Sequence, residues 1–140
     1  MKFPGLERLA GNNMSETNYP IGDFLIRIKN AAQAKNREVT VSATKKKVAI
    51  AKALEKAGFV EEIKSKDGIL SLSVSFSHKS PILMDLRLVS KPGRRVYYKL
   101  SDIEAKRGPS IFLVSTPKGI LTTKEAKKIG SGGEIIAEIW

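Results

Sequence analysis

The sequence predicts an α/β (α+β) protein of two small domains. The first is expected to pack helices on a three-stranded sheet, and the second to be mostly antiparallel β with short helices. Helical and strand periodicities alternate in the first half, turn residues separate short strands in the second half, and a polar break lies at residues 77–81. We expect a flexible extension at residues 1–18, a first domain at 19–78 and a second at 79–140.

A first helix is predicted to begin at Pro20. Apolar residues recur at intervals of three and four over residues 21–32. Asp23 lies in the first turn, where a carboxylate is favourable. Residues 39–41 then alternate valine with a polar neighbour, which predicts a short strand.

A second helix is predicted between Thr44, whose hydroxyl can cap it, and Gly58, a residue type that commonly ends helices. Lys45–Lys47 occupy its first turn. Positive charge is slightly unfavourable at this end of a helix, so three lysines indicate a nearby anion.

The next segments predict a β-hairpin. Val60–Lys64 form the first strand, and Asp67-Gly68 is a dipeptide suited to a type I′ turn. From Leu70 to Phe76, apolar residues alternate with serines, so the returning strand is expected to have one buried and one exposed face.

The second half is predicted to continue with strands joined by turns. Met84, Leu86 and Leu88 alternate with charged residues in a fourth strand, and the basic turn Ser90–Arg95 leads into an extended segment, Val96–Tyr98. Two pairs of residues then have the spacing of a capping box: Ser101 with Glu104, and Thr122 with Glu125. Each pair predicts the start of a short helix.

The remaining segments complete the predicted sheet. Gly108 and Pro109 are expected to end the first short helix, and Gly130 the second. The continuous apolar run Ile111–Val114 is typical of a strand buried on both faces, and Ile135–Ile139 is the last strand.

The composition indicates a polyanionic partner. Lys and Arg number 25 against 14 Asp and Glu, a net charge of +11. Residues 1–70 carry 13 basic and 8 acidic side chains, and residues 71–140 carry 12 and 6, so the excess is +5 and +6. This even division excludes a basic tail attached to a neutral core.

Residues for enzyme chemistry are missing or scattered. The chain has no Cys and a single His, His78, so thiol catalysis, a Ser–His relay and a metal site lack their parts. Gly130–Gly133 follows the predicted helix instead of preceding one and lacks the Lys-Ser/Thr of a phosphate-binding loop. We therefore expect no enzyme, no metal and no cofactor.

A membrane location is also disfavoured. No apolar run approaches the ~18 residues of a membrane span, and residues 1–14 lack the apolar core of a secretory signal. Met14 is a second candidate for the start of the chain. No predicted helix combines a basic face with a bulky aromatic one, as membrane-surface helices do. A cytoplasmic protein is expected.

Basic side chains gather in three clusters: Lys45–Lys47, Arg94–Arg95 and Lys124–Lys128. These clusters favour nucleic acid as the polyanion. In the turn Ser115–Gly119, small hydroxyls and bare glycine backbone can approach irregular nucleotides closely, while Lys118 neutralises phosphate. The ring of Tyr97 or Tyr98 can stack on a base beside the two arginines.

Several segments together match one family pattern. Near the C-terminus they are Val114-Ser115-Thr116-Pro117-Lys118-Gly119-Ile120, Lys124–Ala126 and Gly130–Ile136. Upstream they are Val89–Tyr97, Lys45–Ala51 and Pro20–Ala31. The chain resembles the bacterial small-subunit (30S) ribosomal protein S8 family over roughly everything after Tyr19.

The resemblance implies a structural constituent of the small ribosomal subunit. It would bind the central domain of 16S ribosomal RNA with its second domain, help to assemble the 30S platform and contact neighbouring small-subunit proteins. The loop and the Gly-Gly-Glu segment of the family carry over to Ser115, Thr116, Lys118, Gly119, Gly132, Gly133 and Glu134. Further candidate RNA contacts are Tyr97, Arg94, Arg95, Arg27, Lys29, Asn30 and Lys45.

The chain departs from the family pattern at two places. Pro117 replaces the usual Ser and removes a hydroxyl and a backbone N–H. Glu138 stands where an aromatic residue is common, and Trp140 supplies a ring two residues later.

Some family members also repress translation of their own messenger RNA. The alternatives are a free-standing RNA- or DNA-binding regulator and, third, an adaptor for membranes or acidic proteins.

Overall fold

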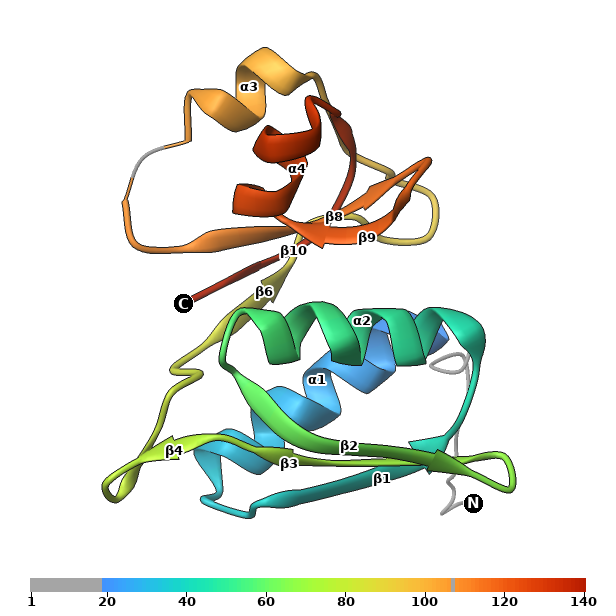
Figure 1. Cartoon of the computed structure of the whole chain (residues 1–140), viewed down its shortest axis with the longest axis vertical. Coiled ribbons are helices and arrows are strands. Elements are labelled where there is room, and N and C mark those ends of the chain that lie inside the picture. The colour runs from blue at the N-terminus through green and yellow to red at the C-terminus, as the bar shows by residue number, and fades with distance from the viewer. Residues whose placement is uncertain (1–18, 107) are drawn as a thin grey trace, which may run out of the picture.

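A computed structural model describes residues 19–106 and 108–140 and shows an α+β fold (Figure 1). In the first half, the helices α1 (Pro20–Gln33) and α2 (Lys45–Lys56) pack on one face of a three-stranded sheet. In the second half, short helices cover an antiparallel sheet. The predicted fold class is therefore confirmed, whereas the predicted extension at 1–18 lies outside the described residues.

The two long helices begin where the sequence predicted. The apolar stripe of α1 is buried, with Leu25 and Ile28 fully inaccessible to solvent. At the start of α2, the Thr44 hydroxyl accepts a hydrogen bond from the backbone N–H of Lys47 at 3.2 Å. This bond satisfies one of the free N–H groups at the helix end.

The first sheet has the strand order β1-β3-β2, with β1 (Glu38–Ser42), β2 (Val60–Lys66) and β3 (Ile69–Val74) all antiparallel to their neighbours. Asp67 and Gly68 both have positive φ, 55° and 75°, as the predicted type I′ turn requires. This confirms the predicted hairpin.

The alternating strand of the first sheet ends earlier than expected. Phe76 belongs to a separate short strand, β4 (Phe76–Ser77), which pairs with β5 (Ser80–Pro81) in a small hairpin. His78 lies at the tip of that hairpin with a φ of 59°. The predicted polar break is thus a turn.

The second sheet places the last strand at its centre. In the order β6-β10-β8-β9, β10 (Gly133–Ile139) lies between β6 (Leu86–Leu88) and β8 (Ile111–Thr116). It also pairs with β7 (Tyr97–Tyr98), and β9 (Gly119–Thr122) closes a hairpin with β8. β9 was not predicted as a strand, because its side chains show no alternation.

Two predictions near the start of the second half are wrong in detail. Met84 lies outside β6 and is 59% exposed, while its neighbour Leu83 is fully buried. Helix α3 (Leu100–Glu104) begins before Ser101, because the N–H of Lys99 donates to the carboxylate of Asp102 at 3.0 Å. Asp102 therefore takes the place that the sequence assigned to Glu104. The helix ends at Glu104, well before the glycine and proline expected to stop it.

Helix α4 (Thr123–Ile129) follows the prediction closely. The N–H of Thr122 donates to the carboxylate of Glu125 at 3.3 Å, which forms half of the expected capping box. Gly130 ends the helix with a φ of 72°, a left-handed conformation that favours glycine.

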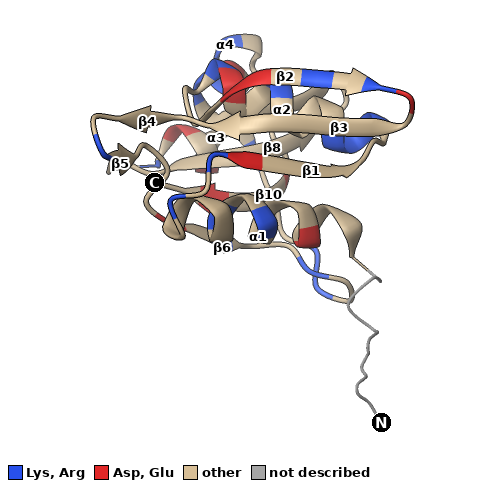
Figure 2. Ribbon diagram, turned by 90° about the horizontal axis from the view of Figure 1, so that it is seen from below, with Lys and Arg blue, Asp and Glu red and all other residues tan. Residues whose placement is uncertain are grey.

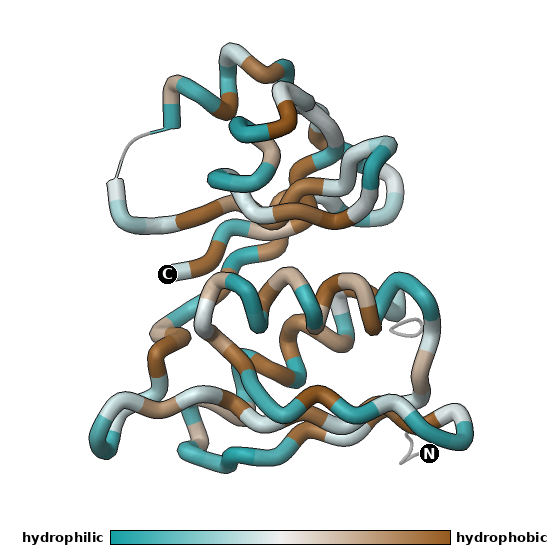
Figure 3. The backbone as a smooth tube through the Cα atoms, in the orientation of Figure 1, coloured by the Kyte–Doolittle hydropathy of each residue, from teal (hydrophilic) through white to brown (hydrophobic). Residues whose placement is uncertain are grey.

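Buried side chains join the two halves. The main apolar cluster contains α1, α2 and first-sheet residues together with residues of the second half: Leu83, Leu86, Leu113, Ile136, Ala137 and Ile139. Figure 3 shows apolar segments running through the region where the halves meet. A second cluster lies between the other face of the second sheet and its short helices. The division at residues 78 and 79 stays a prediction.

Glu138 makes a polar link between three segments of the second half. Its carboxylate accepts hydrogen bonds from Ser110 Oγ at 2.6 Å and from Arg87 Nη2 at 2.7 Å, with Lys106 Nζ at 3.8 Å. These groups, Ser110 first, hold the pKa of Glu138 below its usual value of 4.5. Position 138 therefore carries an ionic link between these segments.

Replacing Glu138 with glutamine is expected to lower the free energy of unfolding at pH 7 by about 1 kcal/mol, because the charge-assisted bonds are weakened. Because the pKa of Glu138 is lower in the folded state, the ionised carboxylate stabilises the protein at pH values above the unfolded pKa, near 4.5. That contribution is lost as pH falls through the folded pKa. Urea unfolding at pH 7 and at pH values below 4.5 should show the variant and the parent converging in acid. A difference that stays constant with pH would contradict this role.

Candidate nucleic-acid interface

The predicted recognition loop is the tip of the β8–β9 hairpin. Thr116 pairs with Gly119 across it, and the Thr116 hydroxyl donates to the Gly119 carbonyl at 2.8 Å. The same hydroxyl accepts from the backbone N–H of Lys118 at 3.1 Å. Thr116 is only 8% exposed, whereas Pro117, Lys118 and Gly119 are exposed. Thr116 therefore shapes the loop from inside, and the exposed residues form its outer surface.

The loop is held against the Gly-Gly-Glu segment by close backbone packing. A Cβ added at Gly133 would lie less than 3.0 Å from the carbonyl oxygen of Ser115. A Cβ at Gly132 would likewise lie less than 3.0 Å from the carbonyl oxygen of Tyr98. Only glycine fits at these two positions, so packing alone explains both residues.

Three predicted residues share one row across the sheet. Tyr97 on β7 pairs with Glu134 on β10, and Glu134 pairs in turn with Ser115 on β8. Residues directly opposite each other in antiparallel strands point to the same face. Tyr97 is 69% exposed, whereas Tyr98 is half-buried and packs edge-on against Phe112 with ring centroids 5.5 Å apart. Of the two tyrosines, Tyr97 is the one available for stacking.

The basic turn before β7 contacts both Glu134 in the row across the sheet and Tyr19 in the first half. Arg94 is exposed and closes the turn by pairing with Lys91. The guanidinium of Arg95 donates to Glu134 Oε2 at 3.2 Å and lies over the ring of Tyr19, 5.3 Å from its centroid. Arg95 therefore joins the predicted site to a residue at the start of α1.

The candidate residues on α1 lie elsewhere. Arg27 and Asn30 border the groove between α1 and β1. Lys29 is half-buried and its ammonium lies 3.4 Å from a carboxylate oxygen of Asp85. A hydrogen bond from the N–H of Leu86, followed by Lys29, lowers the pKa of Asp85. Lys29 is thus already paired within the protein.

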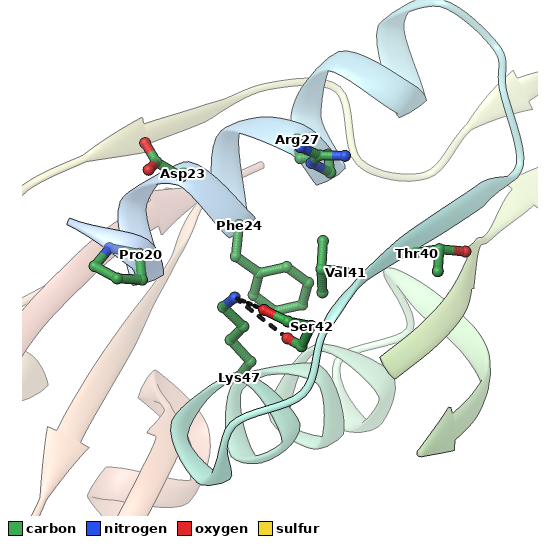
Figure 4. Close-up of a pocket in the computed structure, with 8 residues that line it drawn as sticks. All are labelled: Pro20, Asp23, Phe24, Arg27, Thr40, Val41, Ser42 and Lys47. Atoms are coloured by element: carbon green, nitrogen blue, oxygen red, sulfur yellow. Dashed lines mark hydrogen bonds between the residues drawn. The ribbon is translucent and has the colours of Figure 1, made fainter. Parts of the chain in front are cut away.

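Figure 4 shows the neighbouring pocket, whose lining residues come from α1, β1 and the first turn of α2. Lys47 reaches into it and donates to the carbonyl and hydroxyl oxygens of Ser42 at 3.2 and 3.3 Å. Arg27 lies at its other end. Lys45 lines a different hollow, beside Tyr19 and Arg95.

The described residues of the candidate site offer positive charge and a shaped surface. Basic residues are distributed over both halves (Figure 2). In Figure 1, the β8–β9 hairpin and the start of α2 lie on the same side of the molecule.

In residues 19–106 and 108–140, no three His, Cys, Asp or Glu side chains gather as metal ligands would. Within the described residues, every helix is too short or too polar to span a bilayer.

The family model for ribosomal protein S8 matches residues 19–140. The chain belongs to the ribosomal protein S8 family. Proteins of this family are structural and non-enzymatic, in agreement with the absence of a catalytic residue set in the sequence.

Curated relatives carry the name small ribosomal subunit protein uS8. The relative from Geobacter metallireducens is 40% identical over 133 residues, which cover 91% of this chain and 100% of that protein. The relative from Caldanaerobacter subterraneus is 41% identical over 127 residues, 86% of this chain and 96% of that protein. The similarity therefore extends over nearly the whole chain.

Within this S8-family chain, the structure brings together the predicted residues of the second half: Ser115, Thr116, Lys118, Gly119, Gly132, Gly133, Glu134, Tyr97, Arg94 and Arg95. Arg27, Lys29 and Asn30 lie on α1, apart from that row. Sequence reasoning missed Tyr19, whose phenol donates to the Ser90 carbonyl at 3.0 Å. A single aromatic residue before a helix gives no signal of a contact 71 positions away in the chain.

Proposed function

We propose that this S8-family protein is a constituent of the small ribosomal subunit that binds the central domain of 16S ribosomal RNA. The observation that carries the proposal is the convergence of the hairpin, the Gly-Gly-Glu segment and Tyr97 on one edge of the second sheet. Neighbouring small-subunit proteins are its further partners, and the protein helps to assemble the 30S platform.

Recognition is by contour and charge. The hairpin presents the exposed backbone of Gly119 and the ammonium of Lys118, which suits close contact with an irregular RNA helix. Tyr97 offers a ring for stacking. Arg27, Asn30 and Lys45 add phosphate contacts from the first half, and Lys29 adds one when it leaves Asp85.

Pro117 is compatible with this role. It lies exposed at the hairpin tip, and the bonds of Thr116 to Lys118 and Gly119 fix the loop without its N–H. The hydroxyl of the serine usual at position 117 is lost. The shape of the loop and its backbone groups therefore make the contact with RNA there.

The direct test measures binding of the full chain to a transcript of the 16S central domain across a range of salt concentrations. If about six phosphates are neutralised, log affinity should fall against log salt with a slope near −4 to −5. Random duplex RNA of equal length is the comparison. Equal affinity for both RNAs, or no binding at physiological salt, would refute the proposal.

Replacing Lys118 with glutamine is expected to make the salt slope less steep by about 0.7 to 0.9, because one phosphate contact is removed. The fold should be unchanged, since Lys118 is exposed and only its backbone N–H is bonded to the loop. Lys66→Gln on the outer edge of the first sheet removes the same charge at an exposed position and serves as the control. Identical slopes for the parent and Lys118→Gln would exclude Lys118 from the contact.

Repression of its own messenger RNA is compatible with the same surface. The surface recognises the shape of an RNA helix, and a messenger RNA can present the same shape as ribosomal RNA. Sedimentation separates this role from ribosomal assembly. A ribosomal constituent travels with small subunits at moderate salt, whereas a free-standing regulator stays near the top of the gradient.

A further inference from the structure

The outer edge of β1 faces a groove. β1 pairs with β3 along one side, and α1 lies next to it on the side away from β3 (Figure 2). Two adjoining hollows of about 330 and 300 Å³ lie between α1 and β1, and Arg27 and Thr40 line both of them. Together they form one groove along the strand, from Ser42 at one end to Glu38 at the other. We call it the β1 groove.

Every second residue of β1 points its backbone groups into this groove. The N–H of Ala43 and the carbonyl of Arg37 are bonded to the β2–β3 hairpin, at 2.8 and 2.6 Å, so the odd-numbered residues face β3. The even-numbered residues therefore face away from β3. Among the described residues, the outward N–H groups of Thr40 and Ser42 and the outward carbonyls of Glu38 and Thr40 have no hydrogen-bond partner. These groups alternate as donors and acceptors, as another strand requires.

The opposite edge of the same sheet is protected against further pairing. On β2, the register shifts between Glu61 and Lys64, and Glu62 has a φ of 54°. Bulges and charged side chains of this kind keep additional strands away from an edge. β1 pairs with β3 in unbroken register over all its residues and contains no proline. The sheet therefore leaves one edge open.

The surroundings of the β1 groove favour a polypeptide over other ligands. The carboxylates of Asp23 and Glu38 line it together with the free carbonyls, and all of these groups repel phosphate. Figure 4 shows the Phe24 ring of α1 beside Val41 of β1, which gives the groove an apolar floor. Because α1 lies beyond the edge of β1, a second copy pairing through its own β1 would bring its α1 into the same space (Figure 2). An isolated extended segment fits there.

Charges at the two ends of the groove set the register of such a segment. At one end, the ammonium of Lys47 donates to the carbonyl and hydroxyl oxygens of Ser42 at 3.2 and 3.3 Å. At the other end, Glu38 is exposed and forms no ion pair with a described residue. A carboxylate opposite Ser42 would meet Lys47, and an ammonium opposite Glu38 would meet its carboxylate. Two side chains between them would face the apolar floor.

We propose that the β1 groove binds an extended segment of another protein, which adds to the first sheet as a fourth strand antiparallel to β1. The segment carries a carboxylate opposite Ser42, an ammonium opposite Glu38 and apolar side chains toward α1. Main-chain hydrogen bonds supply the affinity and the end charges supply the selectivity. This inference goes beyond the proposed function and does not rest on it, because the recognition hairpin belongs to the second sheet.

The first test measures amide hydrogen exchange of the full chain by nuclear magnetic resonance. The probe is the blocked peptide Ser-Glu-Val-Thr-Val-Lys-Ser at saturating concentration. It should slow exchange at Thr40 and Ser42 by about tenfold or more and leave Val39 and Val41, which already face β3, unchanged. A uniform change along β1, or none, would overturn the proposal. Slow exchange at Thr40 and Ser42 without peptide would mean that the chain itself fills the groove, which would also overturn it.

The second test removes one donor from the edge. Thr40→Pro deletes the outward N–H and keeps the bonds to β3, and proline is tolerated at such an edge position. It should weaken peptide binding about tenfold, because one main-chain bond is lost and the ring blocks the strand. Thr40→Ala, which keeps the N–H, should change affinity less than twofold.

Ser65→Pro is the matched control, because it removes an outward N–H from the edge of β2. It should also leave affinity within about twofold of the parent. Equal losses from Thr40→Pro and Ser65→Pro would overturn the proposal. If Thr40→Pro does not fold, the same question is put to the ligand: a peptide with proline in place of its central threonine should bind about tenfold more weakly.

The last comparison tests the end charges and the class of ligand. The reversed peptide, Ser-Lys-Val-Thr-Val-Glu-Ser, has the same composition and should bind about threefold more weakly, because its charges match the groove only in the parallel direction. Equal affinity of the two peptides would overturn the assigned register. A 12-nucleotide oligouridylate should leave the exchange of Thr40 and Ser42 unchanged. If it slowed their exchange and the peptide did not, the groove would be a phosphate site and the proposal would be wrong.

Discussion

Replacing Gly133 with alanine is expected to lower the free energy of unfolding by about 2 to 3 kcal/mol and to disturb the pairing of β8 with β10. The added Cβ would lie less than 3.0 Å from the Ser115 carbonyl oxygen. The oxygen is a backbone atom of β8, and the Cβ would be bonded directly to the backbone of the paired strand β10, so relief requires the strands to separate and ladder bonds to weaken. Urea unfolding followed by circular dichroism measures the loss.

Gly58→Ala is the matched control for this substitution. Gly58 has a φ of +89° but nothing within 4 Å of an added Cβ, so only conformational strain of about 1 kcal/mol is expected. If Gly133→Ala cost no more than Gly58→Ala, the close packing between the Gly-Gly-Glu segment and the hairpin would not hold in solution.

Replacing Thr116 with valine is expected to weaken binding to the central-domain transcript by tenfold or more, about 1.4 kcal/mol. Valine keeps the shape of the side chain but loses the bonds to the Gly119 carbonyl and the Lys118 N–H. The loop would then sample other shapes and pay an ordering cost on binding. Because no charge is removed, the salt slope should stay unchanged.

The measurement compares the cognate transcript with random duplex RNA. Nonspecific binding depends on phosphate contacts, so Thr116→Val should leave it unchanged. Thr40→Val, an exposed substitution on β1, controls for loss of a threonine hydroxyl. Equal losses on cognate and random RNA would show that Thr116 does not act through the shape of the loop.

The elements that the sequence predicted well are those with a strong local period or a local cap. The stripe of α1, the Thr44 cap and the box of Thr122 with Glu125 depend only on residues within a turn or two. β9 was missed because Ile120 packs against the first half and Leu121 is also half-buried, which removes the alternation. Met84 was misplaced because an apolar residue beside a strand end fits the period equally well.

The candidate site likewise has features that the local sequence predicts and features that depend on tertiary packing. The hairpin tip could be predicted, because Pro117 fixes its own φ and Gly119 allows the positive φ that the turn uses, 122°. The requirement for glycine at Gly132 and Gly133 could not be predicted. It comes from backbone atoms of Tyr98 and Ser115 that only the folded sheet brings near. The ion pair of Lys29 with Asp85 likewise depends on tertiary packing.

The position of β10 has a consequence for synthesis of the chain. All the strands that pair with β10, namely β6, β7 and β8, precede it in the sequence, whereas the first sheet is complete at residue 74. The amino-terminal sheet can therefore form while the nascent chain is still emerging, and the carboxyl-terminal sheet must wait until residues 133–139 have left the exit tunnel. A polypeptide released prematurely would lack β10, and with it the edge of the second sheet that we propose to contact RNA.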